Sequence, residues 1–131
     1  MITRLILADS SFYMTWQKRR VDPFAIIDSY ELDYEFAING IVWGEVIRGR
    51  SAPTMRDRYE TAFSLTRMLH LTSRGWQRVA RVAWELDRRG EVIPLTDLII
   101  GVTALEHDAA VLTFDRHFQQ IPGLVVLSDL E

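Results

Sequence analysis

Two kinds of hydrophobic pattern alternate along the chain, short apolar runs and longer segments with helical spacing. The apolar runs predict strands over residues 5–9, 35–39, 68–71, 110–113 and 124–127. Apolar positions that recur every three or four residues predict helices over residues 10–19, 23–31, 41–48, 53–68, 73–89 and 96–107, with a single turn at 115–120. Strands and helices therefore alternate from one end to the other.

This alternation predicts an α/β fold, a three-layer α/β/α sandwich with a mainly parallel sheet of four or five strands. No repeat, low-complexity tract or linker interrupts the pattern, so residues 1–131 are expected to form one domain. No apolar run approaches the roughly 18 residues that cross a bilayer. The chain has no cysteine, which excludes disulfides and thiolate metal sites. We expect a soluble, cytoplasmic protein with no membrane association.

The segment 73–89 has the clearest helical pattern, and Gly90 is a natural stop. Its apolar face is formed by Trp76, Val79, Ala83 and Leu86. Its arginines lie largely elsewhere, at Arg74, Arg78, Arg81 and Arg88. By default the tryptophans are placed in the core, and the arginines are expected to pair with Glu85 at helical spacing rather than to contact phosphate.

Four carboxylates stand near the ends of predicted elements. Asp9 ends the first strand, and Glu45 lies in the first turns of the helix that follows the second strand. Asp97 opens the last helix, and Asp115 lies two residues beyond the fourth strand. Each aspartate also has a local explanation, as a helix cap, a residue favoured by the helix dipole or a turn residue. Because strand ends and the following helix starts share one edge of a parallel sheet, the four are predicted to converge.

Clustered carboxylates in a partly dry cleft need compensating cations. Oxygen ligands without cysteine favour one or two Mg²⁺ or Mn²⁺ ions. Two such ions about 3.5–4 Å apart can activate a water and stabilise the leaving oxygen of a phosphodiester displacement. The net charge is −3, and removing the four acids from the balance gives −3 + 4 = +1. The rest of the surface therefore need not repel a polyanion.

Three stretches resemble a known family. They are "LADSSF", "INGIVWGEVIRG" and "GEVIPLTDLIIGVTALEHDAAVLTFDRHFQQIPGLVVL", and together they span most of the chain. In this order they resemble the PIN-domain ribonucleases, and more narrowly the VapC-type toxins of bacterial toxin–antitoxin pairs. Two positions depart from the usual pattern: Asn39 stands where serine or threonine is frequent, and Gly101-Val102 replaces a pair of alanines.

The resemblance implies a single PIN-like nuclease domain, a Mg²⁺- or Mn²⁺-dependent endoribonuclease that cuts single-stranded or looped RNA. It also implies a toxin that forms a homodimer and is neutralised by a small VapB-like antitoxin. The residues expected to be catalytic and to hold the metal are Asp9, Glu45, Asp97 and Asp115. Ser10 and Thr113 are candidates for orienting these carboxylates or a water.

Two other enzyme classes fit the sequence less well. A receiver domain needs an acidic pair after its first strand and a lysine after its last, but the only lysine is Lys18. A haloacid-dehalogenase-type phosphatase needs Asp-x-Asp, and position 11 is Ser11. A non-toxin RNA-processing nuclease and a non-catalytic RNA-binding module on the same fold remain alternatives. The three histidines, His70, His107 and His117, are scattered and receive no catalytic role.

Overall fold

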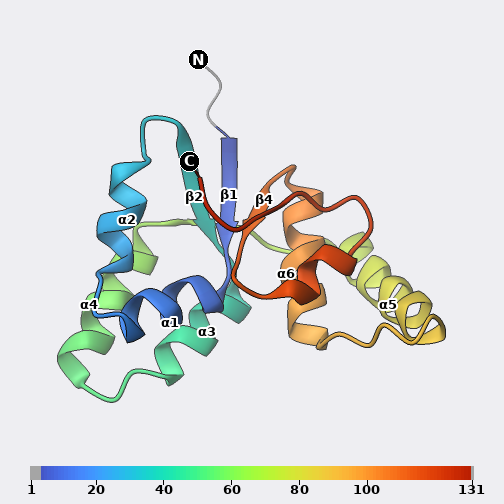
Figure 1. Ribbon diagram of the computed structural model, residues 1–131, viewed down its shortest axis with the longest axis horizontal. Coiled ribbons are helices and arrows are strands. Elements are labelled where there is room, and N and C mark those ends of the chain that lie inside the picture. The colour runs from blue at the N-terminus through green and yellow to red at the C-terminus, as the bar shows by residue number, and fades with distance from the viewer. Residues whose placement is uncertain (1–3, 131) are drawn as a thin grey trace.

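A parallel five-stranded sheet forms the centre of the computed structural model, which describes residues 4–130 (Figure 1). Its strands are β1 (Arg4–Ala8), β2 (Tyr34–Ile38), β3 (Arg67–Met68), β4 (Ala110–Leu112) and β5 (Val126–Leu127). Their order across the sheet is β3-β2-β1-β4-β5, and every neighbouring pair is parallel. β1 is therefore the central strand, with β2 on one side and β4 on the other.

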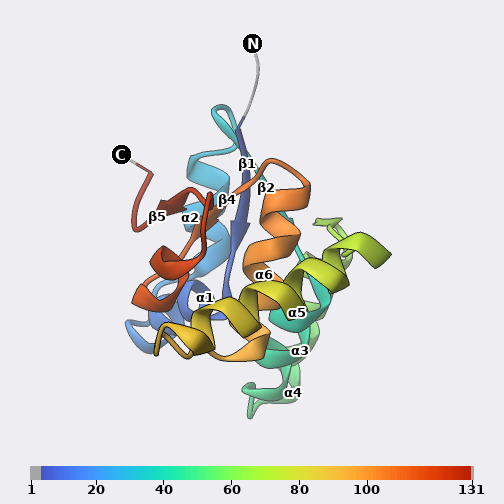
Figure 2. The same ribbon diagram turned by 90° about the vertical axis from the view of Figure 1, so that its right-hand side faces the viewer.

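Six α-helices and one 3₁₀ turn connect these strands. They are α1 (Ser10–Lys18), α2 (Pro23–Ser29), α3 (Gly40–Arg48), α4 (Pro53–Ser64), α5 (Ser73–Arg88), α6 (Leu95–Glu106) and η1 (Arg116–Gln120). Helices α1, α2 and α4 lie on one side of the sheet and α5 and α6 on the other (Figure 1). Turned by 90°, the molecule shows α5 crossing in front of α6 (Figure 2). The predicted three-layer α/β/α sandwich is confirmed, and all of its strand pairs are parallel.

The chain leaves the predicted helix 53–68 early, because α4 ends at Ser64. The Thr66 hydroxyl donates to the Ala62 carbonyl at 2.8 Å, and the Thr66 N–H donates to the Phe63 carbonyl at 3.0 Å. These bonds satisfy the last carbonyls of α4 and turn the chain into β3. The third strand is consequently shorter and earlier than the predicted 68–71, with only Arg67 and Met68 paired to β2.

The core packs against both faces of β1, where Ile6, Leu7 and Ala8 are fully buried. Helix α6 is buried over the whole stretch 98–104. Within it, a Cβ on Gly101 would lie 2.5 Å from Ile121 Cδ1, so glycine at this position permits the close approach of the chain after η1. The departure from the family's alanine pair thus has a packing reason.

Two predictions for the helix 73–89 are wrong. Trp76 and Trp84 are 52% and 58% exposed, because Gly75 and Val82 complete the buried face of α5 and leave the tryptophans outside it. No arginine of α5 forms an ion pair with Glu85 within residues 4–130. The helix therefore presents an aromatic and basic outer surface. In the part of the chain that the structure describes, no helix is long and apolar enough to span a membrane.

Candidate active site

The carboxyl ends of β1 and β4 lie side by side and bring Asp9 and Thr113 together. Ala8 pairs with Leu112 in register, and the Asp9 N–H donates to the Leu112 carbonyl at 3.1 Å. Asp9 follows β1 and caps α1, while Thr113 follows β4 directly. The parallel register therefore fixes Asp9 beside Thr113 although more than 100 residues separate them in sequence.

Protein donors hold both oxygens of the Asp9 carboxylate. Its Oδ1 accepts from the Ser11 hydroxyl at 2.7 Å and from the Phe12 N–H at 3.2 Å, and its Oδ2 accepts from the Thr113 hydroxyl at 2.7 Å. Asp9 is 3% exposed, and burial raises its pKa more than these hydrogen bonds lower it. The first residue of α1 is Ser10, and its N-cap is Asp9, so this aspartate also has the local role of a helix cap.

The two hydroxyls beside Asp9 also fix the chain after β4. The Thr113 oxygen accepts from the Asp115 N–H at 2.9 Å, and the Ser11 oxygen accepts from the Phe114 N–H at 3.0 Å. Each hydroxyl thus donates to Asp9 and accepts from the turn that carries Asp115. The orientation of the Asp115 backbone follows from the same hydrogen bonds that hold Asp9.

Asp97, Asp115 and His117 form the tightest group of possible ligands. One ligand atom from each lies within 4.8 Å of the others. His117 Nδ1 is 3.1 Å from Asp115 Oδ1 and 3.7 Å from Asp97 Oδ2. The backbone N–H of His117 also donates to Asp115 Oδ1, at 2.9 Å. Asp97 comes from the first turn of α6 and Asp115 caps η1. The first turn of α6 and the turn after β4 therefore meet at one point.

The pKa of Asp97 reflects the charges of the other residues in the cluster. Its side chain is 16% exposed, and its pKa is raised to about 6, chiefly by burial and then by the negative charges of Asp115 and Asp9. His117 lowers this pKa, and the charge of Glu45 raises it. All four predicted carboxylates are thus close enough to interact, because the charges of the other three each raise the pKa of Asp97.

Glu45 reaches the cluster from α3, which Asn39 caps by accepting the Val42 N–H at 3.1 Å. The Oε1 atom of Glu45 accepts a hydrogen bond from the Ser10 hydroxyl at 2.9 Å. The amide of Asn39 thus serves the capping role expected of serine or threonine at that position. Ser10 in turn ties α1 to α3 beside the carboxylates.

The donor set fits a hard divalent cation. Carboxylate oxygens are the ligands that Mg²⁺ and Mn²⁺ favour, and one imidazole nitrogen is compatible with Mn²⁺. Within residues 4–130, no backbone N–H or hydroxyl donates a hydrogen bond to Asp97, and His117 is the only basic side chain within 4.0 Å of it. The charge gathered around Asp97 is therefore poorly compensated by the protein itself.

Two residues of this site, Ser11 and His117, were not among the predicted site residues. Ser11 lies in the "LADSSF" motif but was given no role, and His117 was given no catalytic role. Each lies two residues after a site aspartate, Ser11 after Asp9 and His117 after Asp115. That spacing is typical of a turn in which the later residue bonds back to the aspartate, and it is the signal by which both were recognisable.

Comparison with known proteins gives a family match and several structural matches. The model of the PIN domain family matches residues 6–124. No curated protein sequence matches the chain. The structure is similar to DNA-bound VapBC from Salmonella typhimurium, with 23% identity, a TM-score of 0.77, and coverage of 95% of this chain and 97% of the other.

Two further solved structures have the same fold. VapBC2 from Rickettsia felis, bound to a promoter DNA fragment, is 18% identical with a TM-score of 0.77, covering 93% of this chain and 96% of that one. VapBC-5 from Mycobacterium tuberculosis, described as a member of the VapBC family of toxin–antitoxin systems, is 14% identical with a TM-score of 0.63, covering 94% and 97%. At these identities the likeness concerns the fold.

Proposed function

The chain belongs to the PIN domain family, and from that premise we propose that it is a metal-dependent endoribonuclease acting on single-stranded or looped RNA. PIN domains are generally nucleases that use divalent metals. The proposal treats residues 1–131 as one PIN-like nuclease domain. The observation that carries it is the meeting of Asp97 and Asp115 beside Asp9, with Glu45 close enough to raise the pKa of Asp97.

The cation would be one or two Mg²⁺ or Mn²⁺ ions, held by Asp97 and Asp115 and, directly or through water, by Asp9 and Glu45. When bound, it would lower the pKa of a water and offset charge on the scissile phosphate. Asp97 must be ionised to take part, and its pKa of about 6 leaves it largely ionised at neutral pH. A cation would favour that ionised form further.

The remaining residues of the site position these carboxylates. Ser10 orients Glu45 through its hydroxyl, and Thr113 and Ser11 fix the Asp9 carboxylate between them. The His117 backbone N–H donates to Asp115 Oδ1, and its imidazole lies within 4.0 Å of both Asp115 and Asp97. Donors on the protein therefore preorganise three of the four carboxylates, which reduces the ordering that cation and substrate binding must supply.

The biological role we propose is that of a cytoplasmic toxin that forms a homodimer and is neutralised by a small VapB-like antitoxin. The support is the resemblance of the site motifs to VapC-type toxins, together with the fold shared with proteins crystallised as VapBC complexes. The proposal for the partner is separable from the proposal for the chemistry, since the carboxylate cluster supports cleavage whether or not an antitoxin binds.

The test is cleavage of total cellular RNA with Mg²⁺ or Mn²⁺, with mapping of the new 5′ ends. We expect specific cuts that EDTA abolishes. Asp97→Asn should reduce the rate by at least about 100-fold, since it removes a carboxylate from the cation site. Asp87→Asn, an exposed aspartate on α5, is the matched control and should cleave normally. Cleavage by a folded Asp97→Asn protein at the wild-type rate would refute the proposal.

A further inference from the structure

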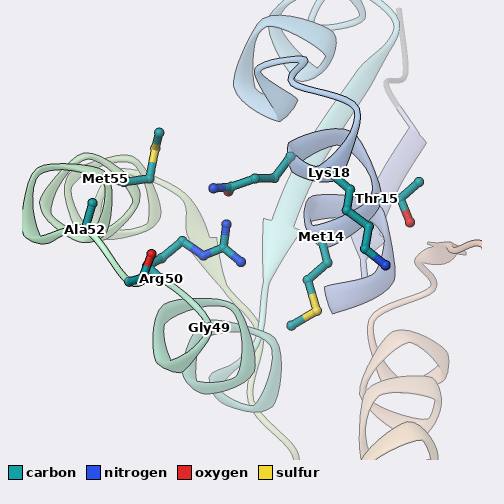
Figure 3. Close-up of a pocket in the computed structure, with 9 residues that line it drawn as sticks. Met14, Thr15, Lys18, Gly49, Arg50, Ala52 and Met55 are labelled. Atoms are coloured by element: carbon teal, nitrogen blue, oxygen red, sulfur yellow. The ribbon is translucent and has the colours of Figure 1, made fainter.

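A pocket of about 520 Å³ opens between α1 and the connection from α3 to α4 (Figure 3). Met14, Thr15 and Lys18 of α1 line one side of it, and Arg50, Ala52 and Met55 line the other. Among the residues that the structure describes, no carboxylate lines it, although acids outnumber bases in the chain as a whole. The pocket therefore differs in charge from the carboxylate cluster nearby.

The pocket lies one helical turn from the candidate active site. Ser10 and Glu45, joined by a hydrogen bond, precede Met14 and Gly49 by four residues on α1 and α3. A Cβ placed on Gly49 would lie 4.0 Å from the Met14 Cε, so the two helices are still in contact there. One turn is about 5.4 Å, which is close enough for a nucleotide neighbouring the scissile phosphate to enter the pocket.

Its two cations have no acidic partner. No ion pair within residues 4–130 involves Lys18 or Arg50. Arg50 Nε donates to the Val46 carbonyl at 3.1 Å, and its guanidinium lies 5.4 Å from the centre of the Tyr59 ring. Tyr59 is itself fixed by donating to Gln17 Oε1 at 2.7 Å. The arginine is thus held in place while its terminal nitrogens make no hydrogen bond within the described residues.

The pocket also offers an apolar surface. Met14 and Met55 are 36% and 37% exposed, on opposite sides of the opening. Thioether side chains make favourable contacts with aromatic rings, and a base presents such a ring. An anion flanked by a flat apolar group is therefore the ligand that matches this combination of side chains.

We propose that this pocket binds a nucleotide of single-stranded RNA that flanks the scissile phosphate. Lys18 and Arg50 contact its phosphate, and Met14 and Met55 contact its base. The inference rests on the proposed function and assigns that function a binding subsite beyond the four carboxylates. RNA fits better than an apolar or cationic peptide because the lining has two cations and no acid.

The test is binding of a fluorescein-labelled single-stranded RNA of about ten nucleotides in EDTA, measured by fluorescence anisotropy over a series of salt concentrations. Without a divalent cation the RNA stays uncut, so binding is separated from cleavage. Lys18→Gln with Arg50→Gln should weaken binding by about 10-fold or more and reduce the slope of log Kd against log salt by about 1.4, which corresponds to two phosphate contacts.

A second variant removes no charge. Ala52→Phe places a ring in the pocket and should weaken binding several-fold with the salt slope unchanged. The matched control for charge is Arg74→Gln with Arg81→Gln, two exposed arginines of α5 that form no ion pair with residues 4–130. This variant should retain near wild-type affinity. Melting temperatures show whether each variant is folded. If the double variant unfolds, Lys18→Gln alone, at an exposed position, replaces it in the binding measurement.

Three results would overturn the subsite. They are no RNA binding by the wild-type protein, unchanged affinity in the pocket variants, and an equal loss in the α5 control. Unchanged affinity would mean that the pocket takes some other ligand, such as a segment of a partner protein. Cleavage of RNA with Mn²⁺ distinguishes the failure of the subsite from the failure of the nuclease function. If the wild-type protein cuts RNA and the pocket variants bind RNA normally, only the subsite is refuted.

Discussion

The two halves of the carboxylate cluster are built differently. Around Asp9, one backbone N–H and two hydroxyls donate to the carboxylate, which is almost completely buried. Around Asp97, no protein hydroxyl or backbone N–H donates within residues 4–130, and burial, followed by neighbouring negative charges, raises its pKa to about 6. The protein supplies hydrogen-bond donors to the carboxylate of Asp9, whereas it supplies none to that of Asp97 within the described residues.

This difference separates structural and chemical roles within one site. The half around Asp9 ties β1 to β4 through the protein's own hydrogen bonds and needs no ligand to stay ordered. The half around Asp97 is costly in the ionised form without a cation, so a bound cation relieves that cost as it gains its ligands. Substitutions in the first half should therefore reduce stability, and substitutions in the second should reduce cation binding.

The largest effect on stability is expected from Thr113→Val. The change is nearly isosteric, and it leaves Asp9 Oδ2 without a protein donor and the Asp115 N–H without an acceptor. We expect a loss of about 2 kcal/mol in the free energy of unfolding, measured by urea denaturation. The control is Thr66→Val, a partly buried hydroxyl that donates to the Ala62 carbonyl at 2.8 Å, with an expected loss below about 1 kcal/mol. Equal losses would contradict the special role of Thr113.

Ser10→Ala should affect activity more than stability. The hydroxyl orients Glu45, so its loss is expected to slow RNA cleavage by about 10-fold, or about 1.4 kcal/mol, with a melting temperature near that of wild type. Ser10→Thr keeps the hydroxyl and should recover part of the rate. Ser64→Ala, which removes an exposed hydroxyl on α4, is the control. A cleavage rate unchanged by Ser10→Ala would leave Glu45 without this support.

Asp97 should make the cation-free protein sensitive to pH. Its folded pKa of about 6 lies above the ordinary value of 3.8. The protonated form of Asp97 therefore favours the folded state. Its contribution to the free energy of unfolding is fully present below pH 3.8 and is lost as the pH rises through 6. Asp97→Asn should stabilise the cation-free protein by about 1 kcal/mol at pH 7 after solvent screening, and very little at pH 4. Denaturation in EDTA at both values measures this, and destabilisation at pH 7 would be the opposite result.

The smallest effect is expected at His117. When protonated, His117 lowers the pKa of Asp97, so His117→Ala should raise that pKa further while the backbone N–H of residue 117 still bonds to Asp115. Carboxyl ¹³C chemical shifts of Asp97 followed through a pH titration without metal measure the change. A decrease in the pKa would show that the imidazole acts on Asp97 by something other than its charge.

Sequence patterns predicted the fold and the placement of the carboxylates because both follow from local periodicity and from the topology of parallel sheets. Asp9 and Asp115 end up at one edge because the strands before them are neighbours in register. The pattern did not predict Ser11 and His117 as parts of the site, since their contacts depend on turn geometry. It also placed Trp76 in the core, because helical spacing alone does not reveal that Gly75 and Val82 complete the packed face.

The most direct test of the central claim is Mn²⁺ binding, followed by electron paramagnetic resonance of the free ion as protein is added. The wild-type protein and Asp87→Asn should bind Mn²⁺ with equal affinity. Asp97→Asn should bind at least about 10-fold more weakly while remaining folded, because it removes the carboxylate that the protein leaves uncompensated. Equal Mn²⁺ affinity in Asp97→Asn and wild type would contradict a cation site at Asp97.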